Sequence, residues 1–331
     1  MIFLCHIISF VFAFVLDLIL GDLHNFPHPV RLIGKTVLFF ENRFIGKKGS
    51  EKNLSAKKKR MFGRFEVFLV CLIFFVLTFF LVFFMYKISL VLACFCEIIL
   101  SCYLIACKNL KDESMKVFKM LEKKDILGAR KALSNIVGRD TQNLSEEEIV
   151  KASVETVAEN TSDGVIAPLF YLALGGPALG ILYKCINTMD SMIAYKNTRY
   201  IDFGRCAAFC DDAANFIPSR ITALLICFAS VFLGKDFSAK NAWKIFCRDR
   251  FNHESPNSAQ SESAAAGSLG LKLGGPAFYE GKLEEKKFIG DERRKASKED
   301  IKKINKLLYF SAVFFVFLST LVMLILFSFI K

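Results

Sequence analysis

The segment 155–171 sets carboxylates and amides directly against an apolar run of membrane character. If it is helical, Glu155 and Glu159 are four residues apart and share a face, as do Thr156 and Asn160. Two carboxylates at the mouth of a bilayer repel each other and resist loss of hydration, so something must offset that cost. A divalent cation, Arg or Lys side chains, or a polar substrate would do so. The pattern indicates a site rather than core packing.

Four further polar clusters lie beside apolar segments, within 183–200, 211–220, 247–262 and the loop 22–35. Ionisable groups at membrane depth are costly and are usually functional, so this many together indicate a polar cavity. The candidate residues of these four clusters are Asp22, His28, Arg31, Lys184, Asn187, Asp190, Lys196, Asn197, Arg199, Asp211, Asp212, Arg220, His253 and Asn257.

Each cluster also has a purely structural explanation. Lys184 and Asp190 could form a buried ion pair that fixes helix register. His28 and His253 are single histidines near prolines, which favours hydrogen bonding or substrate orientation over metal ligation. Gly-Gly-Pro at 274–276 is typical of a turn.

The clustered side chains suit phosphate chemistry. Carboxylates bind Mg²⁺, which keeps waters and also binds phosphates. Lysine and arginine neutralise phosphate oxygens, and arginine does so through a bidentate fork. The sequence has no P-loop motif and no nucleophile-elbow motif. The residues alone therefore indicate a membrane enzyme or transporter with a polar, Mg–phosphate type of cavity, and they name no substrate. The cations concerned are Lys184, Lys196, Arg199 and Arg220.

Composition indicates a membrane protein. Of 331 residues, 53% are hydrophobic and 36 are Phe, and the apolar residues fall in blocks long enough to cross a bilayer. We predict an all-α fold: one polytopic membrane domain over 1–331 with re-entrant or broken central helices. A signal peptide is the alternative for the first block, which lacks a basic start and a cleavage site. The predicted spans lie near 2–20, 65–86, 88–107, 165–184, 221–233 and 307–330.

The central spans are expected to be irregular. Asp163 and Gly164 predict a cap or break, the Gly-Gly-Pro at 175–177 predicts a second break, and Pro218 is expected to end a helix before Arg220. Non-helical backbone at membrane depth must be buried in protein or line a cavity.

Basic residues orient the chain. Segments 47–64, 107–133 and 234–306 are rich in Lys and Arg, so the positive-inside rule places them in the cytoplasm. We therefore predict a cytoplasmic helical insert at 108–150 and a cytoplasmic loop at 234–306. Nucleic-acid binding is disfavoured, because these runs flank spans and lack interleaved aromatic residues.

The insert shows helical spacing and a start signal. Val117, Leu121, Leu127 and Leu133 are expected to face inward, and Ser145 with Glu148 predicts a capping box. The 11 Cys residues lie mostly in apolar segments such as those around 71, 94, 102 and 227, and we expect buried free thiols rather than a disulfide framework.

Five blocks resemble the cobalamin biosynthesis family CobD/CbiB. They are GDLHNFPHPVRLIG, ETVAENTSDGVIAPLFYLALGGP, YKCINTMDSMIAYKNTRYIDFG, DDAANFIPSRITA and HESPNSAQSESAAAGSLGLKLGGPAFYEG, in this order and across nearly the whole chain. The resemblance implies an adenosylcobinamide-phosphate synthase: an ATP-dependent ligase of the cytoplasmic membrane that joins adenosylcobyric acid to (R)-1-aminopropan-2-ol or its O-phosphate. A departure stands at Phe209 and Cys210, where the family usually has Arg-Leu.

The implied reaction assigns roles to the candidate residues. Mg²⁺ and ATP are implied, and association with other membrane corrinoid-assembly enzymes is a further expectation. The expected metal ligands are Glu155, Glu159, Asp163 and Asp190. The expected base is Asp211, Asp212 or His253. The expected substrate-binding residues are His28, Arg31, Asn160, Lys184, Asn187, Lys196, Asn197, Arg199, Arg220 and Asn257.

Two other functions remain open from the sequence. A non-catalytic membrane regulator resembling AmpE would need no phosphate-binding charges. A corrinoid or solute transporter would use the same cavity without changing its cargo covalently.

Overall fold

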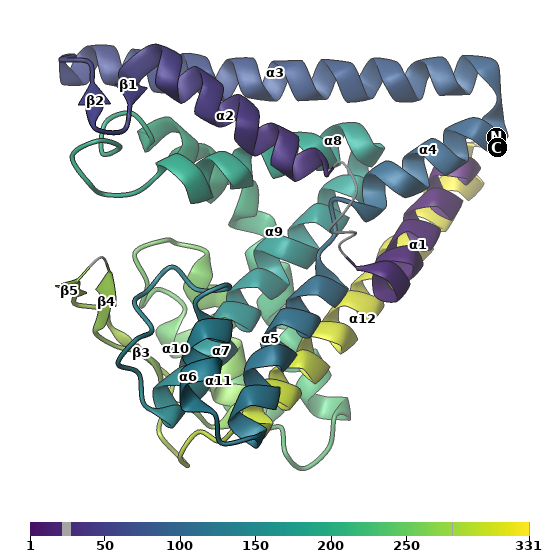
Figure 1. Cartoon of the computed structure of the whole chain (residues 1–331). Coiled ribbons are helices and arrows are strands. Elements are labelled where there is room, and N and C mark those ends of the chain that lie inside the picture. Colours follow the sequence, from purple (N-terminus) through teal and green to yellow (C-terminus); the bar gives the residue numbers. More distant parts are fainter. Residues whose placement is uncertain (22–27, 280, 331) are drawn as a thin grey trace. The chain divides into compact units, whose positions relative to one another are not determined.

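The computed structural model describes residues 1–21, 28–279 and 281–330, and these are mostly helical (Figure 1). Five helical stretches in this part of the chain are long and apolar enough to cross a membrane, and a bent pair makes a sixth. This confirms the prediction of an all-α, polytopic membrane protein with broken central helices. The helices are α1 (Ile2–Leu20), α2 (Pro29–Ile45), α3 (Ala56–Ile88), α4 (Leu90–Cys102), α5 (Cys107–Glu122), α6 (Ile126–Leu133), α7 (Glu146–Asn160), η1 (Thr161–Ile166), α8 (Ala167–Ile193), α9 (Arg205–Phe232), α10 (Ala239–Asp249), α11 (Ser258–Leu269) and α12 (Glu299–Ile330).

Short antiparallel strand pairs lie in the segments that connect the helices. β1 (Gly46–Lys47) pairs with β2 (Ser50–Glu51), β3 (Leu273–Gly274) with β6 (Phe288–Ile289), and β4 (Ala277–Tyr279) with β5 (Lys282–Glu284). Each strand has two or three residues, so the pairs hold loop segments together and do not form an extended sheet.

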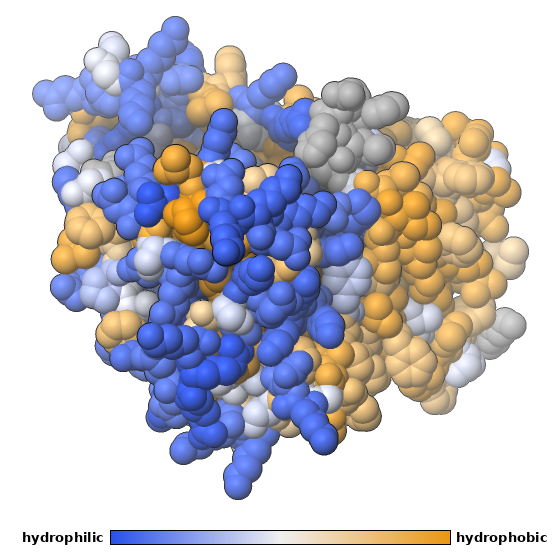
Figure 2. Space-filling model, turned by 60° about the horizontal axis from the view of Figure 1, so that its bottom comes forward, coloured by the Kyte–Doolittle hydropathy of each residue, from blue (hydrophilic) through white to orange (hydrophobic). Residues whose placement is uncertain are grey.

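The chain forms two compact units that interleave in sequence. Unit 1 comprises 1–105, 167–215 and 318–331; unit 2 comprises 106–166 and 216–317. In unit 1, α1 packs against α4, and α3 packs against α8. In unit 2, α10 packs closely against α11. Figure 2 shows many hydrophilic side chains on the face drawn, with hydrophobic ones among and beside them.

The predicted break at Gly-Gly-Pro is confirmed inside α8. Gly175 and Gly176 have non-helical backbone angles, and Pro177 follows them. Gly176 has a φ of +62°, which disfavours any side chain, and a Cβ there would lie 3.4 Å from the His6 imidazole.

Pro218 does not end a helix, so that prediction was wrong. The helix α9 continues through it to Phe232, with a bend of 47° between 205–214 and 216–232. A proline cannot donate to the carbonyl four residues before it and its ring clashes there, which bends the helix. The carbonyl concerned belongs to Ala214, and it accepts the Tyr171 hydroxyl at 2.9 Å instead.

Asp163 and Gly164 lie in the π-helical turn η1 rather than at a helix end. The backbone stays helical from α7 into α8, but the wider turn leaves carbonyls without their usual partner. The Gly164 carbonyl is satisfied by the Ala106 N–H at 3.1 Å. The predicted irregularity is therefore present, but as a bulge.

Two side-chain predictions for the insert and the thiols need correction. Val117, Leu121 and Leu133 are buried as expected, whereas Leu127 is 74% exposed because α6 is only two turns long and turns this side outward. Cys5 and Cys94 form a disulfide between α1 and α4, with Cα atoms 5.9 Å apart, so these thiols are not free. Contact between segments 89 residues apart has no signal in cysteine spacing.

The predicted capping box at the start of α7 is confirmed. The Ser145 hydroxyl accepts the Glu148 N–H at 3.4 Å, and the Glu148 carboxylate accepts the Ser145 N–H at 2.7 Å. We expect Ser145→Ala to lower the free energy of unfolding by about 1 kcal/mol, because it leaves a helix N–H without a partner. Thermal unfolding of the purified protein measures this, and Ser134→Ala at an exposed position is the matched control. Equal losses in both variants would show that the cap does not stabilise α7.

Candidate functional site

The helices α7 and α11 of unit 2 bring acidic and hydroxyl groups together. Glu155 and Glu159 share one face of α7, as the sequence predicted. On α11, Ser258 and Glu262 are likewise four residues apart, and the Ser258 hydroxyl donates to Glu159 at 2.9 Å. All of α11 is buried, and its small residues allow it to approach α10 closely: a Cβ on Gly267 would lie 2.4 Å from the Asn241 carbonyl.

Two glycines close the site from the side of β3. Gly274 and Gly275 have φ angles of +69° and +89°, which favour glycine; Gly274 ends β3, and residues 275–276 connect it to β4. Side chains would also collide there: a Cβ on Gly274 would lie 2.6 Å from the Lys287 carbonyl. Without a side chain at this position, the Gly274 N–H donates a hydrogen bond to the Glu155 carboxylate at 2.6 Å.

Arg139 pairs with Glu155 at the centre of this arrangement. The guanidinium forms an ion pair and hydrogen bond with one carboxylate oxygen, while Gly274 holds the other. Burial lowers the pKa of Arg139, but Glu155 outweighs this effect and raises it, so the guanidinium stays charged. Neighbouring backbone bonds fix the Arg139 loop, since the Asp140 N–H donates to the Phe278 carbonyl at 2.8 Å.

Glu262 is the least compensated charge in the site. Its side chain is 6% exposed, and within the described residues it has no hydrogen-bond or ion-pair partner. Burial raises the pKa of Glu262 well above its usual range, and repulsion by Glu159 and Glu155 raises it further. The nearby cations Arg139 and Lys286 act in the opposite direction but do not reverse this shift of the pKa.

A pH effect on stability follows from Glu262. Because its pKa is raised in the folded state, it favours folding fully below the unfolded carboxyl pKa of about 4.3, and this contribution is lost as pH rises towards the folded value. We expect the unfolding temperature of the parent protein to fall between pH 5 and 8 more than that of Glu262→Gln. Thermal unfolding across this range measures the difference. Parallel curves for the two proteins would contradict it.

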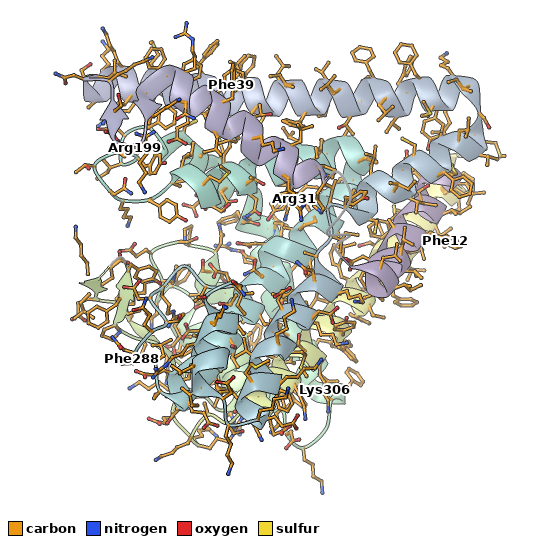
Figure 3. All side chains as sticks on the ribbon, viewed as in Figure 1. Phe12, Arg31, Phe39, Arg199, Phe288 and Lys306 are labelled. Atoms are coloured by element: carbon orange, nitrogen blue, oxygen red, sulfur yellow. A yellow bond between two sulfur atoms is a disulfide. The ribbon has the colours of Figure 1, made fainter. Side chains whose placement is uncertain are left out.

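Two adjoining cavities in unit 2 share Arg139, Glu155, Gly274, Gly275 and Ala277. The larger has a volume of about 960 Å³, within the upper range of small-molecule sites, and the smaller about 70 Å³. The larger adds Lys151, Lys272, Phe278, Phe288, Glu148 and Glu292, among others. The smaller adds Thr156, Glu159, His253, Glu262, Tyr279, Lys286, Lys287 and Ile289. Phe288 is labelled in Figure 3.

His253 faces the smaller cavity in a defined hydrogen-bonding state. Its Nδ1 accepts the Ser255 N–H at 3.0 Å, so this nitrogen carries no proton in the neutral ring. The proton then lies on Nε2, which makes His253 a hydrogen-bond donor to a ligand. A role as base requires that the Ser255 bond open, because Nδ1 is the nitrogen that can accept a proton.

Unit 1 holds a second polar group, between α8 and α9. Asp211 accepts hydrogen bonds from Asn215 at 3.0 Å and from Asn187 at 3.4 Å. Asn215 is fully buried and in turn accepts the Tyr183 hydroxyl at 2.9 Å. This network orients Asp211 and Asn187, two residues singled out from the sequence, towards each other.

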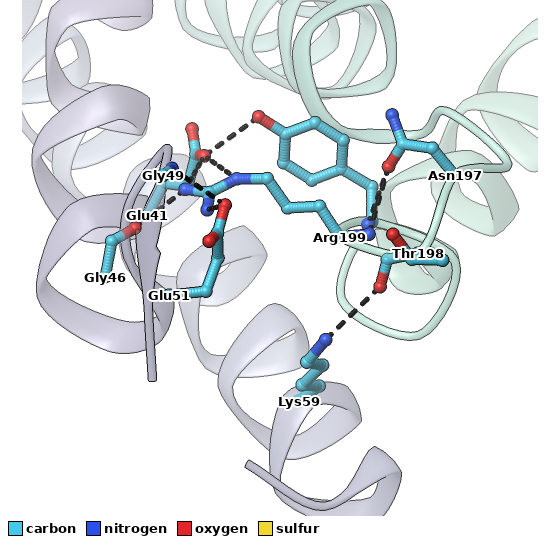
Figure 4. A network of polar contacts seen from close by, with 9 residues as sticks. Glu41, Gly46, Gly49, Glu51, Lys59, Asn197, Thr198 and Arg199 are labelled. Atoms are coloured by element: carbon cyan, nitrogen blue, oxygen red, sulfur yellow. Dashed lines mark hydrogen bonds and ion pairs between the residues drawn. The ribbon is translucent and has the colours of Figure 1, made fainter. Parts of the chain in front are cut away.

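Arg199, predicted to bind substrate, is held in a network within unit 1 (Figure 4). The guanidinium donates to Glu41 at 2.6 and 3.0 Å, to Glu51 at 2.9 Å and to the Gly46 carbonyl at 2.7 Å. The Tyr200 hydroxyl also donates to Glu41, at 2.9 Å. Arg199 and Glu41 are 8% and 3% exposed, so this is a buried ion pair that fastens the β1–β2 hairpin.

The remaining predicted residues are distributed over both units. In unit 2, Asn257 accepts from Arg220 at 3.1 Å and from Ser219 at 3.2 Å, and Asn160 donates to the Thr156 carbonyl at 3.0 Å. In unit 1, His28 caps α2 through a bond from the Val30 N–H. Asp163 in unit 2 is half-buried, as are Lys184, Asp190 and Asp212 in unit 1, while Arg31, Lys196 and Asn197 are exposed. Asp22 lies outside the described residues.

Glu262 belongs to the polar cluster 247–262 found in the sequence but was assigned no role there, and most of the cationic lining was missed. Arg139 was not among the residues that the sequence singled out. Glu262 had a signal, because it is the one charged residue in the Ala-, Ser- and Gly-rich stretch 258–269, where only close packing explains the small side chains. The missed cations are Arg139, Lys151, Lys272, Lys286 and Lys287.

Metal binding depends on which His, Cys, Asp and Glu side chains lie close together. Among the described residues, no three His, Cys, Asp or Glu side chains are grouped closely enough to hold a metal ion alone. Mg²⁺ commonly uses only one or two carboxylates together with phosphate oxygens and waters. The acidic face of α7 is therefore compatible with Mg²⁺ that arrives on a nucleotide.

Comparisons with known proteins give a consistent result. The CobD/Cbib protein family is matched over residues 10–308. A cobalamin biosynthesis protein CobD of Clostridium perfringens is 48% identical over 301 residues, which cover 91% of this chain and 93% of that protein. One of Clostridium tetani is 42% identical over 315 residues, covering 95% and 97%. No solved structure matches the chain.

Proposed function

Because the chain belongs to the CobD/CbiB family, we propose that it is the ligase that joins adenosylcobyric acid to an amino alcohol at the expense of ATP. It is an enzyme of cobalamin biosynthesis and a multi-pass helical membrane protein. The amino alcohol is (R)-1-aminopropan-2-ol or its O-phosphate, and the product is adenosylcobinamide or its phosphate. We place the protein in the cytoplasmic membrane.

The observation that carries this proposal is the pair of adjoining cavities in unit 2. Amide formation from a free carboxylate needs activation, and ATP supplies it if the carboxylate oxygen attacks the γ-phosphorus to give an acyl phosphate and ADP. The amine then attacks the acyl carbon, phosphate leaves, and the amine gives up a proton. Such a sequence needs one cavity for a nucleotide and a smaller one for the amine, in contact with each other.

The larger cavity suits the phosphates of ATP. Lys151, Lys272 and Arg139 line it, so negative charge that develops on the transferred phosphoryl group meets fixed cations. Phe278 and Phe288 offer apolar surface for a base or ring. Mg²⁺ bound to the phosphates would supply further neutralisation, and Glu155 presents carboxylate oxygens to both cavities.

Several sequence predictions continue as proposals. Asp163 and Asp190 remain candidate metal ligands. Asp211, Asp212 and His253 remain candidates for the base that accepts the amine proton. The proposed contacts to corrinoid amides and phosphates are those of His28, Arg31, Asn160, Lys184, Asn187, Lys196, Asn197, Arg220 and Asn257.

Isotope transfer tests the proposed reaction. Adenosylcobyric acid labelled with ¹⁸O in its free carboxylate is incubated with the purified protein, Mg-ATP and the amino alcohol. The proposal expects one ¹⁸O atom per turnover in inorganic phosphate. Label in AMP would replace the acyl phosphate with an acyl adenylate, and amide product without ATP consumption would overturn the proposal.

A further inference from the structure

The smaller cavity in unit 2 has the dimensions of a very small ligand. The cavity has a volume of about 70 Å³. Because one water needs roughly 10–15 Å³ of such volume, the cavity holds on the order of five non-hydrogen atoms. This is too small for a nucleotide or a corrinoid. It matches a short amino alcohol, whose remainder can extend through the shared wall of Arg139, Glu155, Gly274, Gly275 and Ala277 into the larger cavity.

Three carboxylates and the three cations Arg139, Lys286 and Lys287 line this cavity, and two of the carboxylates form no ion pair with these cations. Glu155 is already neutralised by Arg139 and held by the Gly274 N–H. Within the described residues, Glu159 accepts a hydrogen bond from the neutral Ser258 hydroxyl and forms no ion pair. Glu262 has no hydrogen-bond or ion-pair partner there, although it is almost fully buried. Burial opposes ionisation of a carboxyl group that has no ion pair, and a cationic ligand that fits here favours the ionised form and pairs with it.

The geometry favours an ammonium group over a bare metal ion. A metal needs several ligands in fixed directions, and the described residues do not group three acidic, His or Cys side chains in this way. A primary ammonium has three donors that can be directed to two carboxylates and one further acceptor. His253 Nε2–H remains to donate to an oxygen, such as the hydroxyl of an amino alcohol.

We propose that this cavity is the subsite for the amine substrate, with Glu262 and Glu159 binding its ammonium group and His253 binding its hydroxyl. This inference rests on the ligase function proposed above. It places the amine nitrogen beside the wall shared with the nucleotide cavity, where the activated carboxyl group would be presented. Glu262 becomes a positioning and binding residue for the second substrate.

Isosteric variants test the subsite because they remove a charge without creating a new void. Glu262→Gln and Glu159→Gln keep the volume and remove the charge; Glu285→Gln, at an exposed position in the same region, is the matched control. In full-length protein in nanodiscs, calorimetry with (R)-1-aminopropan-2-ol and with its O-phosphate, without ATP, should show at least tenfold weaker binding for both site variants. The KM for the amine should rise by the same factor in both site variants, while their KM for ATP stays at the parent value. Glu285→Gln should match the parent protein in both constants.

The outcomes separate this inference from the ligase proposal. Unchanged amine binding and KM in Glu262→Gln, in a protein that still makes product, would overturn the subsite and leave the ligase intact. Amine binding that depends on Glu262 in a protein that makes no product would leave the subsite and overturn the ligase. Loss of Mg²⁺ binding with normal amine binding would make the cavity a metal site and overturn the subsite. Should Glu262→Gln fail to fold, Glu159→Gln provides the same comparison at the second carboxylate.

Discussion

Arg139→Leu is expected to lower the free energy of unfolding by about 3 kcal/mol and to reduce ligase activity by about 100-fold. The stability loss arises because Glu155 stays buried without the cation that neutralises it. The activity loss arises because a fixed cation disappears from the wall shared by both cavities. Chemical unfolding and initial-rate kinetics measure the two effects separately.

A second variant distinguishes the two causes. In Arg139→Leu combined with Glu155→Gln, the remaining amide still accepts the Gly274 N–H but carries no charge. Most of the stability should return while the activity remains low. If activity returns together with stability, Arg139 acts only through folding, and its assignment to the phosphate cavity is wrong.

Arg199→Leu is expected to lower the free energy of unfolding by about 3 to 5 kcal/mol, because Glu41 is then buried without its partner and the β1–β2 hairpin loses its anchor (Figure 4). Arg199→Lys should recover little of this, since an ammonium cannot replace the bonds to Glu41, Glu51 and Gly46 together. The unfolding midpoint in denaturant is the measurement.

The exposed Arg43→Leu, on the same helix as Glu41, is the control for removal of an arginine from this region. An Arg199→Leu protein as stable as this control, but with a raised KM for ATP, would restore the phosphate-binding role that the sequence predicted and would refute the structural role.

Much of the fold could be predicted from the sequence. Apolar blocks mark the spans because a bilayer demands about twenty apolar residues, and Gly175 to Pro177 mark a break because glycine and proline weaken a helix locally. The error at Pro218 has a tertiary cause: Tyr171, distant in sequence, satisfies the carbonyl that proline leaves free, so the helix bends and continues. Local signals predict a weak point in a helix, but only its surroundings decide whether the helix ends.

The site could be predicted less completely. Glu155, Glu159 and His253 were recognised because carboxylates beside an apolar run and a histidine beside proline stand out by residue type. Arg139 and Lys286 did not stand out, because surface lysine and arginine are common and only folding brings these two to α7. The role of Arg199 was also hidden, since its partner Glu41 is 158 residues away in the chain. Residue type identifies candidates, whereas partners are decided by the fold.

Mass spectrometry of the corrinoid tests the central claim most directly. Purified protein in nanodiscs is incubated with adenosylcobyric acid, Mg-ATP and either (R)-1-aminopropan-2-ol or its O-phosphate. The account predicts a corrinoid heavier by the amino alcohol less one water, formed only when ATP is present. A corrinoid of unchanged mass, whether left outside or carried across the membrane, would contradict the ligase and favour a regulator or a transporter.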